Sequence, residues 1–320
     1  MYKVSVVIPV YNVEAYIVHC AESLFNQTLD DMQFIFVDDA SQDNSIALLE
    51  QTLQRFPHRI SQTIILHHPE NKGIPAARAT GLAHVDAQYV ADCDSDDYVA
   101  PAMYAKLYEK AVQDDSDMVI CGRILHYPDG REVPVLDRID PKESLILNFL
   151  RDRLSASVWN RLTKTVVSRK AQFSKENFYE DWVLTAQLLT YAERVTFLDE
   201  FLYYHNCRRP MSITTDSREE VLEQILRQCL ENYYLMHDFL VKRQHIEEKN
   251  FTYKKQSVRT QFLLPAKRWS CRKRYLQTFP EINFSLLFSR IVPFHHKVYH
   301  ITVLLGLHLI SKPVYNLFRK

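Results

Sequence analysis

Four aspartates crowd into the stretch Tyr89–Tyr98, where Asp92, Asp94, Asp96 and Asp97 follow the apolar end of a predicted strand. Carboxylates this close repel one another and raise one another's pKa values unless a cation compensates. Aspartate oxygens are hard ligands that suit Mg²⁺ or Mn²⁺. The stretch therefore predicts one of two things: a metal site that holds a phosphorylated substrate, or an acidic surface turn whose aspartates cap a helix.

The elements that must position this stretch alternate in type along the first part of the chain. Apolar, β-branched runs predict buried strands at residues 4–8, 34–37, 63–67 and 89–91, and helical spacing follows at about residues 14–25, 45–55 and 76–85. Such alternation gives a parallel sheet that helices cover on both faces, and its ligands bind at the carboxyl ends of the strands. A polar turn follows each run here, at Tyr11-Asn12, Asp38-Asp39, Asn71-Lys72 and Asp94 to Asp97. Four polar turns at one edge favour the metal site over the surface turn.

Residues 101–215 are predicted to extend this α/β domain. Strands are expected at residues 117–122, 195–198 and 202–205, with a hairpin turn at Pro128-Asp129-Gly130. Residues 158–162 and 166–167 are expected to carry the chain back towards the sheet. Helices are expected from residue 101 to about 113, at 141–151 and 183–192, and from about 219 to 243. We therefore expect an α/β domain over residues 1–215 and a helical C-terminal region over residues 216–320.

Charge is distributed unevenly although the formal net charge is zero. Residues 251–320 hold thirteen Lys and Arg and one acid, Glu281, so the tail carries about +12 and the rest about −12. Cations beside aromatic residues are typical of a helix lying on anionic lipid, and the alternatives are a solvated helical bundle or a partner-binding surface. The acidic body argues against a nucleic-acid partner.

The sequence also predicts where the protein acts. Six widely spaced cysteines without zinc spacing indicate reduced thiols of a cytosolic chain. The first residues run into a strand without the apolar region of a signal peptide, and no apolar run of about eighteen residues predicts a membrane span. We expect a cytoplasmic protein, peripheral at the inner face of the cell membrane; its sequence does not set an oligomeric state.

Five motifs in order resemble those of inverting glycosyltransferases of family 2, of the bacterial surface-polysaccharide type. They lie at Val4–Asn12, Val37–Ser45, Glu70–Gly81, Ala91–Pro101 and Glu180-Asp181. The resemblance covers about residues 3–215 and implies the GT-A (nucleotide-diphospho-sugar transferase) fold, with a mostly parallel sheet and helices on both faces. It also implies a nucleotide-sugar donor, with a UDP-sugar favoured, a divalent Mg²⁺ or Mn²⁺ ion, and transfer with inversion to a hydroxyl of a saccharide or lipid-linked saccharide. The pathway implied is capsule, exopolysaccharide or O-antigen biosynthesis.

The resemblance assigns roles to individual residues. On the donor side it places Pro9, Tyr11 and Glu14 in the base pocket, Asp39 on the base's N–H, and Lys72 and Arg78 near the nucleotide and pyrophosphate. Asp94 faces the ribose or the metal, and Asp96 is the favoured metal ligand. Asp181 matches the general base. His205, a further candidate metal ligand, matches with Arg208, Arg209 and Ser212 a segment that closes over the diphosphate.

Several of these residues have other interpretations. Arg78 pairs with an aspartate in one of them, and His205 is a packed histidine in another. Asp97 is expected to cap a helix, with acceptor contact as the alternative, and Trp159 to pack in the core rather than stack on a sugar. A nucleotidyltransferase is the alternative enzyme class, although five glycines offer little for a glycine-rich phosphate loop. A non-catalytic protein that binds nucleotide-sugars or acts as a membrane scaffold is the third hypothesis.

Overall fold

A computed structural model describes residues 1–207, 219–263 and 269–306 of the 320-residue chain. The chain forms two compact units, one of residues 1–138 and 156–214 and the other of residues 139–155 and 215–320. The segment 139–155, which the sequence interpretation assigned to the first domain, thus groups with the C-terminal unit. Arg208, Arg209 and Ser212 lie outside the described residues.

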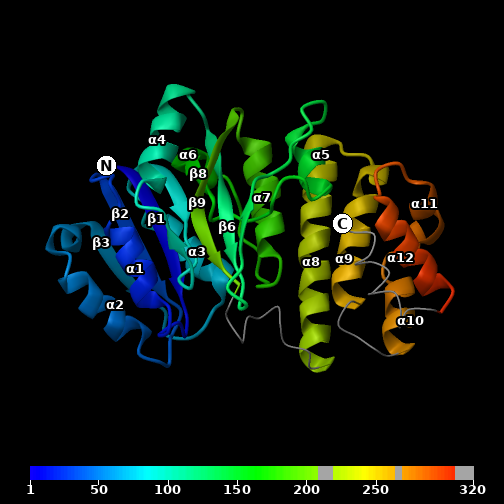
Figure 1. The fold of residues 1–320 in the computed structure, drawn as a ribbon, viewed down its shortest axis with the longest axis horizontal. Coiled ribbons are helices and arrows are strands. Elements are labelled where there is room, and N and C mark those ends of the chain that lie inside the picture. The colour runs from blue at the N-terminus through cyan, green and yellow to red at the C-terminus, as the bar shows by residue number, and fades with distance from the viewer. Residues whose placement is uncertain (208–218, 264–268, 307–320) are drawn as a thin grey trace. The chain divides into compact units, whose positions relative to one another are not determined.

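Four parallel strands form the first half of a nine-stranded sheet (Figure 1). Their order is β3 (Thr63–His67), β2 (Met32–Asp38), β1 (Tyr2–Val10) and β4 (Ala87–Asp92). Most of β1 and all of β2 are buried, which explains why these strands read as continuous apolar runs rather than alternating ones. Because the four strands run in one direction, the turns that follow them lie at one edge, as the sequence predicts.

Helices cover both faces of this half. Three of them pack on one face: α1 (Ile17–Phe25), α2 (Ser45–Gln54) and α4 (Met103–Gln113), with the short 3₁₀ helix η1 (Pro57–Gln62) after α2. The other face carries α3 (Ile74–Ala83), whose Ala77 packs with Val7 of β1. Gly81 lets α3 approach closely, since a Cβ there would lie 2.3 Å from a methyl group of Val7. The predicted α/β fold class is confirmed.

The second half of the sheet mixes strand directions. There β8 (Arg161–Lys164) lies antiparallel between β4 and β6 (Met118–His126). β6 pairs in parallel with β9 (Val195–Asn206), and β9 pairs antiparallel with β5 (Tyr98–Val99). The predicted hairpin is confirmed, because β7 (Glu132–Val135) pairs antiparallel with β6.

The structure differs in detail from the sequence interpretation in this half. Of the segments expected to return to the sheet, 158–162 enters it only at residue 161, and residues 166–167 lie in the short helix α6 (Thr165–Ser168). The two strands expected between 195 and 205 are one strand, with an irregular register opposite Gly122 of β6. The helix expected at 183–192 is present as α7 (Glu180–Tyr191), and Asp181 lies in its first turn.

The C-terminal unit is helical. It contains α5 (Leu145–Leu150), α8 (Glu219–Gln244), the 3₁₀ helix η2 (Glu248–Phe251), α9 (Thr252–Leu263), α10 (Trp269–Gln277), α11 (Ile282–Phe288) and α12 (Phe294–Leu304). None of the helices in the described ranges is long and apolar enough to cross a membrane.

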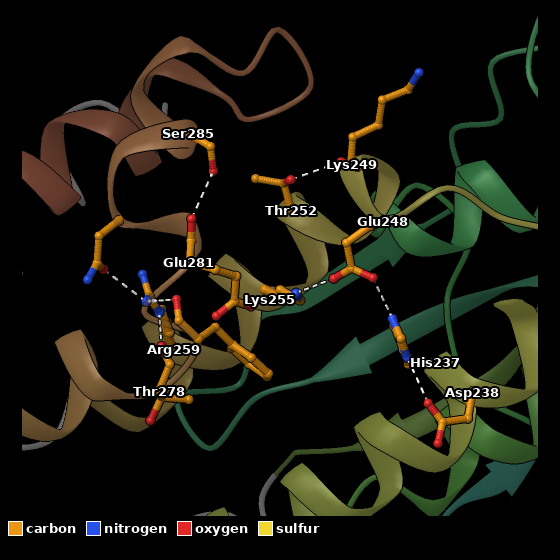
Figure 2. A network of polar contacts seen from close by, with 12 residues as sticks. His237, Asp238, Glu248, Lys249, Thr252, Lys255, Arg259, Thr278, Glu281 and Ser285 are labelled. Atoms are coloured by element: carbon orange, nitrogen blue, oxygen red, sulfur yellow. Dashed lines mark hydrogen bonds and ion pairs between the residues drawn. The ribbon is translucent and has the colours of Figure 1, made fainter.

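Several cations of this unit are buried in ion pairs and hydrogen bonds, as Figure 2 shows for Lys255 and Arg259. Lys255 donates hydrogen bonds to Glu248 and, at 2.6 Å, to Glu281. Arg259 donates to the carbonyl oxygen of Thr278. Buried charges are stable only when they are paired in this way, so these side chains act as internal cross-links between helices.

Three further cations are also engaged within the unit. Lys254 pairs with Asp152, Arg272 donates to the carbonyl oxygen of Val303 at 2.8 Å, and Arg274 pairs with Glu223. Five of the cations that suggested contact with anionic lipid therefore serve the fold of the unit itself. Lys267 and Arg268 lie outside the described residues.

His300 on α12 gives this unit a predicted pH dependence. It is fully buried, with Nδ1 2.9 Å from the hydroxyl of Tyr275 and Nε2 2.8 Å from the carbonyl oxygen of Asn283. Burial, with the charge of Arg259 adding to it, holds the pKa of His300 below its ordinary value despite the hydrogen bond to Asn283. The folded unit therefore binds fewer protons than the unfolded chain, and its stability falls as the pH falls below about 6.5.

We predict that α12 loses protection from hydrogen exchange between about pH 7 and pH 5, after correction for intrinsic exchange rates. His300→Gln removes the titrating group and should flatten this pH dependence. His245→Gln changes an exposed histidine of the same unit and should leave the profile as it is. An identical pH dependence in the His300 variant and the unmodified protein contradicts the assignment.

Candidate active site

A pocket of about 370 Å³ lies at the carboxyl ends of β1, β2 and β4. Eight of the residues singled out from the sequence line it: Pro9, Tyr11, Asp39, Arg78, Asp94, Asp96, Asp181 and His205. Glu14 and Lys72 do not line it; the Glu14 carboxylate accepts from the backbone and side chain of Asn44, both at 3.1 Å. The topology thus brings together residues that lie almost two hundred positions apart.

A single guanidinium group joins the acidic parts of this pocket. Arg78 on α3 is 4% exposed; its Nη1 donates to Glu180, the first residue of α7, and its Nη2 donates to Asp94 at 3.0 Å. Asp92 lies 3.5 Å from Nε of the same side chain. The loop after β4 is therefore tied to the helix that carries Asp181.

Burial and this shared cation set the ionisation of the acids. Burial raises the pKa of Asp92 to about 6 although Arg78 lowers it. Burial also raises the pKa values of Asp94 and Glu180 against the same opposing charge. Burial alone would lower the pKa of Arg78, but Glu180, Asp94 and Asp92 together raise it. Three carboxylates thus surround one guanidinium group, a crowded acidic setting that a further cation would stabilise.

Asp39 fixes the loop at one side of the pocket. Its Oδ1 accepts from the backbone N–H of Lys72 at 2.8 Å, and its Oδ2 accepts from that of Gly73 at 2.7 Å. The Nδ1 atom of His68 lies 2.7 Å from Oδ1. Lys72 therefore takes part in the site through its backbone, and Asp39 positions a loop in addition to lining the pocket.

Gly73 and Asn177 join two walls of the pocket. Gly73 has a φ of +87°, and a Cβ there would lie 2.0 Å from Oδ1 of Asn177. The same oxygen accepts from the backbone N–H of Ile74 at 3.1 Å. Asn177 lines the pocket and was missed from the sequence, because its partner lies about a hundred residues away and nothing local marks it.

The start of α7 is set by an unusual backbone conformation. Tyr179 has a φ of +62°, and its ring lies 4.4 Å from that of Trp182. A left-handed conformation outside glycine costs about 1–3 kcal/mol and persists where the surroundings impose it, often at functional sites. It turns the chain so that Glu180 meets Arg78 while Asp181, the next residue, lines the pocket.

Asp97 does not cap a helix, so that prediction was wrong. Helix α4 begins at Met103, and the Asp97 carboxylate is buried 2.7 Å from the hydroxyl of Tyr203 and 3.1 Å from Nδ1 of His205. It also accepts from the backbone N–H of Asn206 at 2.7 Å. Asp97 therefore ties the aspartate-rich loop to β9.

Aromatic packing fixes His205 from a second side. Trp159 stacks on His205 with ring centres 5.2 Å apart and on Tyr203 with ring centres 4.2 Å apart. Trp159 is almost buried yet lines the pocket, so it belongs both to the core and to the site. Burial lowers the pKa of His205, but its hydrogen bond to Asp97 and the charges of the nearby aspartates outweigh that and raise it.

The donor set fits a divalent ion that the substrate helps to bind. Residues 1–207, 219–263 and 269–306 contain no group of three or more His, Cys, Asp or Glu arranged to hold a metal. Asp94, Asp96 and His205 nevertheless line one pocket. Mg²⁺ needs only one or two carboxylates beside water and substrate phosphates. Because Nδ1 of His205 is held by Asp97, Nε2 remains as a ligand atom, an arrangement common at metal sites.

Comparison with known proteins agrees with this geometry. The model of glycosyl transferase family 2 matches residues 5–180, more than half of the chain. The uncharacterized glycosyltransferase EpsJ of Bacillus subtilis is 32% identical over 235 residues, which cover 70% of this chain and 66% of EpsJ. The poly(ribitol-phosphate) beta-glucosyltransferase of Bacillus spizizenii is 27% identical over 215 residues, which cover 65% of this chain and 32% of that enzyme. The chain thus spans less than two thirds of the length of these relatives.

Two solved structures share the fold. The TarS 1–349 structure of S. aureus in complex with UDP-GlcNAc has a TM-score of 0.61 at 19% identity, covering 99% of this chain and 91% of TarS 1–349. The mannosyltransferase PcManGT of Pyrobaculum calidifontis, in complex with GDP-Man and Mn²⁺, has a TM-score of 0.55 at 13% identity, covering 100% of this chain and 88% of that one.

The chain belongs to glycosyltransferase family 2 and has the GT-A fold. Membership of that family places it among the glycosyltransferases rather than the nucleotidyltransferases. The roles of individual residues in the pocket remain predictions.

Arg78 offers a test of how the pocket is held together. Arg78→Met leaves Asp92, Asp94 and Glu180 without their shared cation and should lower the free energy of unfolding by about 3–5 kcal/mol. Arg78→Lys keeps the charge but cannot span two carboxylates, so its loss should be smaller. Urea unfolding measures both.

The matched control is Arg55→Met, because Arg55 pairs with Glu22 at 2.7 Å while its side chain is 53% exposed. An exposed pair contributes less than about 1 kcal/mol. Equal losses for the Arg78 and Arg55 methionine variants contradict the central role of Arg78.

Proposed function

We propose that this protein transfers a sugar, with inversion, from a nucleotide-sugar donor to a hydroxyl of a saccharide or lipid-linked saccharide. A UDP-sugar is the favoured donor, and Mg²⁺ or Mn²⁺ is the proposed cofactor. The observation that carries the proposal is the single pocket that Tyr11, Asp39, Asp94, Asp96 and Asp181 line together. In this proposal the pocket binds the nucleotide beside Tyr11 and Asp39 and the diphosphate beside Asp94 and Asp96, and Asp181 is the candidate base.

The nucleotide side lies at the ends of β1 and β2. Tyr11 is 42% exposed, so its ring is accessible for stacking on a base, and Pro9 lies beside it in the pocket. Asp39 accepts hydrogen bonds from the backbone of Lys72 and Gly73 in the loop after β3 and lies 2.7 Å from Nδ1 of His68, and each carboxylate oxygen has more than one lone pair. It therefore keeps capacity for the N–H of a base. Glu14 and Lys72 are proposed only as outer contacts of this side, with Lys72 acting through its backbone.

The diphosphate side lies after β4. When bound there, a divalent cation neutralises charge that builds up on the diphosphate leaving group. Asp96 is the proposed main ligand, with Asp94 and His205 beside it. Arg78 holds Asp94 by a hydrogen bond, and Asp97 holds His205, so the ligand atoms are oriented before a donor arrives.

The proposed base is Asp181. An acceptor hydroxyl is a poor nucleophile until a group in hydrogen-bond reach takes its proton. A carboxylate does this when the hydroxyl attacks the anomeric carbon from the face opposite the diphosphate. One displacement then inverts the anomeric centre without a covalent intermediate, in contrast to the paired carboxylates of retaining glycosidases. Glu180 neighbours Asp181 and positions it through Arg78.

The relative that acts on poly(ribitol-phosphate) supports a surface polymer as the product pathway of this chain. We propose that the protein acts in the cytoplasm at the inner face of the membrane, where a lipid-linked acceptor is accessible. A non-catalytic role in binding nucleotide-sugars is the competing hypothesis, and loss of transfer in an Asp181 variant distinguishes the two.

Two isosteric variants separate donor binding from transfer. Asp96→Asn should abolish Mn²⁺-dependent binding of UDP in calorimetry, because it removes the favoured ligand. Asp181→Asn should bind UDP and Mn²⁺ normally but lose donor turnover and transfer by about 100-fold or more, the usual contribution of a general base. A screen of nucleotide-sugars with Mn²⁺ first identifies the donor.

Asp199→Asn is the control, because Asp199 is an exposed aspartate of the same unit. It should match the unmodified protein in both assays. Normal Mn²⁺-dependent UDP binding by the Asp96 variant would refute the metal assignment, and full transfer by the Asp181 variant would refute the base.

Asp97 is predicted to position His205 rather than to touch the donor. Asp97→Asn weakens the hydrogen bond to Nδ1 and should reduce Mn²⁺ affinity in the presence of UDP by about 10- to 100-fold. Calorimetry measures this directly. Asp238→Asn weakens a surface contact of 2.9 Å to Nδ1 of His237 and should have no effect on Mn²⁺ affinity. Unchanged Mn²⁺ affinity in a folded Asp97 variant contradicts the positioning role.

A further inference from the structure

The last helices of the C-terminal unit expose large apolar side chains. On α11, Phe284 and Phe288 are 78% and 83% exposed, and they lie four residues apart on one face. Ile282 and Leu286 of the same helix are buried. A short amphipathic helix normally buries its aromatic residues, so α11 has an apolar face toward the unit and a second apolar face toward solvent.

The same pattern recurs on α12. Phe294, Ile301 and Leu305 are 68%, 42% and 68% exposed. Their spacing of seven and four residues puts them in one stripe along the helix. The opposite face buries Tyr299 and Val303 against Tyr275 of α10.

The two helices contact each other. Nε2 of His300 on α12 lies 2.8 Å from the carbonyl oxygen of Asn283 on α11. Figure 1 shows α11 and α12 in orange and red at the end of the described chain. We call the outward side chains of residues 284, 288, 294, 301 and 305 the aromatic–aliphatic surface. Scattered apolar residues on a surface are ordinary, but a group of five on two adjoining helices marks an interaction site.

Charge indicates what covers this surface. Residues 282–320 contain Arg290, Lys297, Lys312, Arg319 and Lys320 and no Asp or Glu. Arg290 is exposed in the link between the two helices, and Lys297 is half-buried on α12. Five other cations of this unit are paired internally, whereas no acidic side chain of residues 282–320 can neutralise Arg290 or Lys297 from within that segment.

We propose that α11 and α12 form a docking surface for an anionic lipid bilayer. Phe284, Phe288 and Phe294 enter the boundary between headgroups and acyl chains, and Arg290 and Lys297 contact lipid phosphates. A segment without acids complements an anionic surface, whereas a second copy of this chain would bring the same cations face to face. The surface lies on the membrane rather than crossing it. This proposal does not depend on the proposed reaction.

The test uses the 320-residue chain and two kinds of vesicle, pure phosphatidylcholine and a phosphatidylcholine–phosphatidylglycerol mixture. Sedimentation should show binding to the mixed vesicles that weakens as salt rises. Phe284→Ser/Phe288→Ser/Phe294→Ser should weaken this binding by about tenfold or more. Arg290→Glu/Lys297→Glu should weaken it by at least about fivefold for each charge. The substituted phenylalanines are exposed, so the circular dichroism spectrum should not change.

Leu235→Ser/Val241→Ser is the matched control, because both residues are exposed apolar positions on α8 of the same unit. It should bind vesicles normally. Three results overturn the proposal: no binding of the unmodified protein to mixed vesicles, equal binding of the phenylalanine variant, or loss of self-association in that variant without any vesicle binding. The last result assigns the surface to contact between copies.

Discussion

The site depends on one buried cation. Arg78 contacts Asp94 in the loop after β4 and Glu180 at the start of α7, and Asp92 lies 3.5 Å away. Without it, the carboxylates of Asp92 and Asp94 at the end of β4 and of Glu180 at the start of α7 would repel one another in a medium of low polarity. With it, the loop that carries the proposed metal ligand and the helix that carries the proposed base are held in a fixed position relative to each other. Transfer between a donor and an acceptor requires such a fixed position, because small displacements of the reacting groups lower the reaction rate by large factors.

A second set of contacts brings β9 into the same site. Asp97 holds Tyr203 and His205, and Trp159 stacks on both of their rings. These contacts link the first, parallel half of the sheet to the later, mixed half. The donor side of the pocket is thus formed by strand ends that follow one another in the sequence. The remaining wall of the pocket is formed by residues between 158 and 205, far along the chain.

The parts of the site that follow a strand end were predictable, since apolar runs and polar turns are local patterns. The motif resemblance located Asp94, Asp96, Asp181 and His205, all of which line the pocket. The role of Asp97 was not predictable, because a buried aspartate and a helix cap look alike in sequence when the partner lies about a hundred residues away. Asn177 was missed for the same reason. The composition of the basic tail suggested that its cations face anionic lipid, and for Lys255 and Arg259 the structure shows otherwise. Lys255 pairs with Glu281 and Arg259 donates to the carbonyl oxygen of Thr278, and the amino-acid count does not reveal these contacts.

The central claim is that the donor binds at the carboxyl ends of β1, β2 and β4, with its base at β1 and β2 and its diphosphate after β4, and that Asp181 is reserved for the acceptor. A crystal structure of the protein with Mn²⁺ and UDP, with anomalous scattering recorded at the manganese edge, tests it most directly. The account predicts a manganese peak in contact with the Asp96 carboxylate, the base beside Tyr11 and Asp39, Arg78 still paired with Glu180, and Asp181 free of nucleotide. A manganese peak away from Asp96, or a diphosphate bound against Asp181, would contradict it.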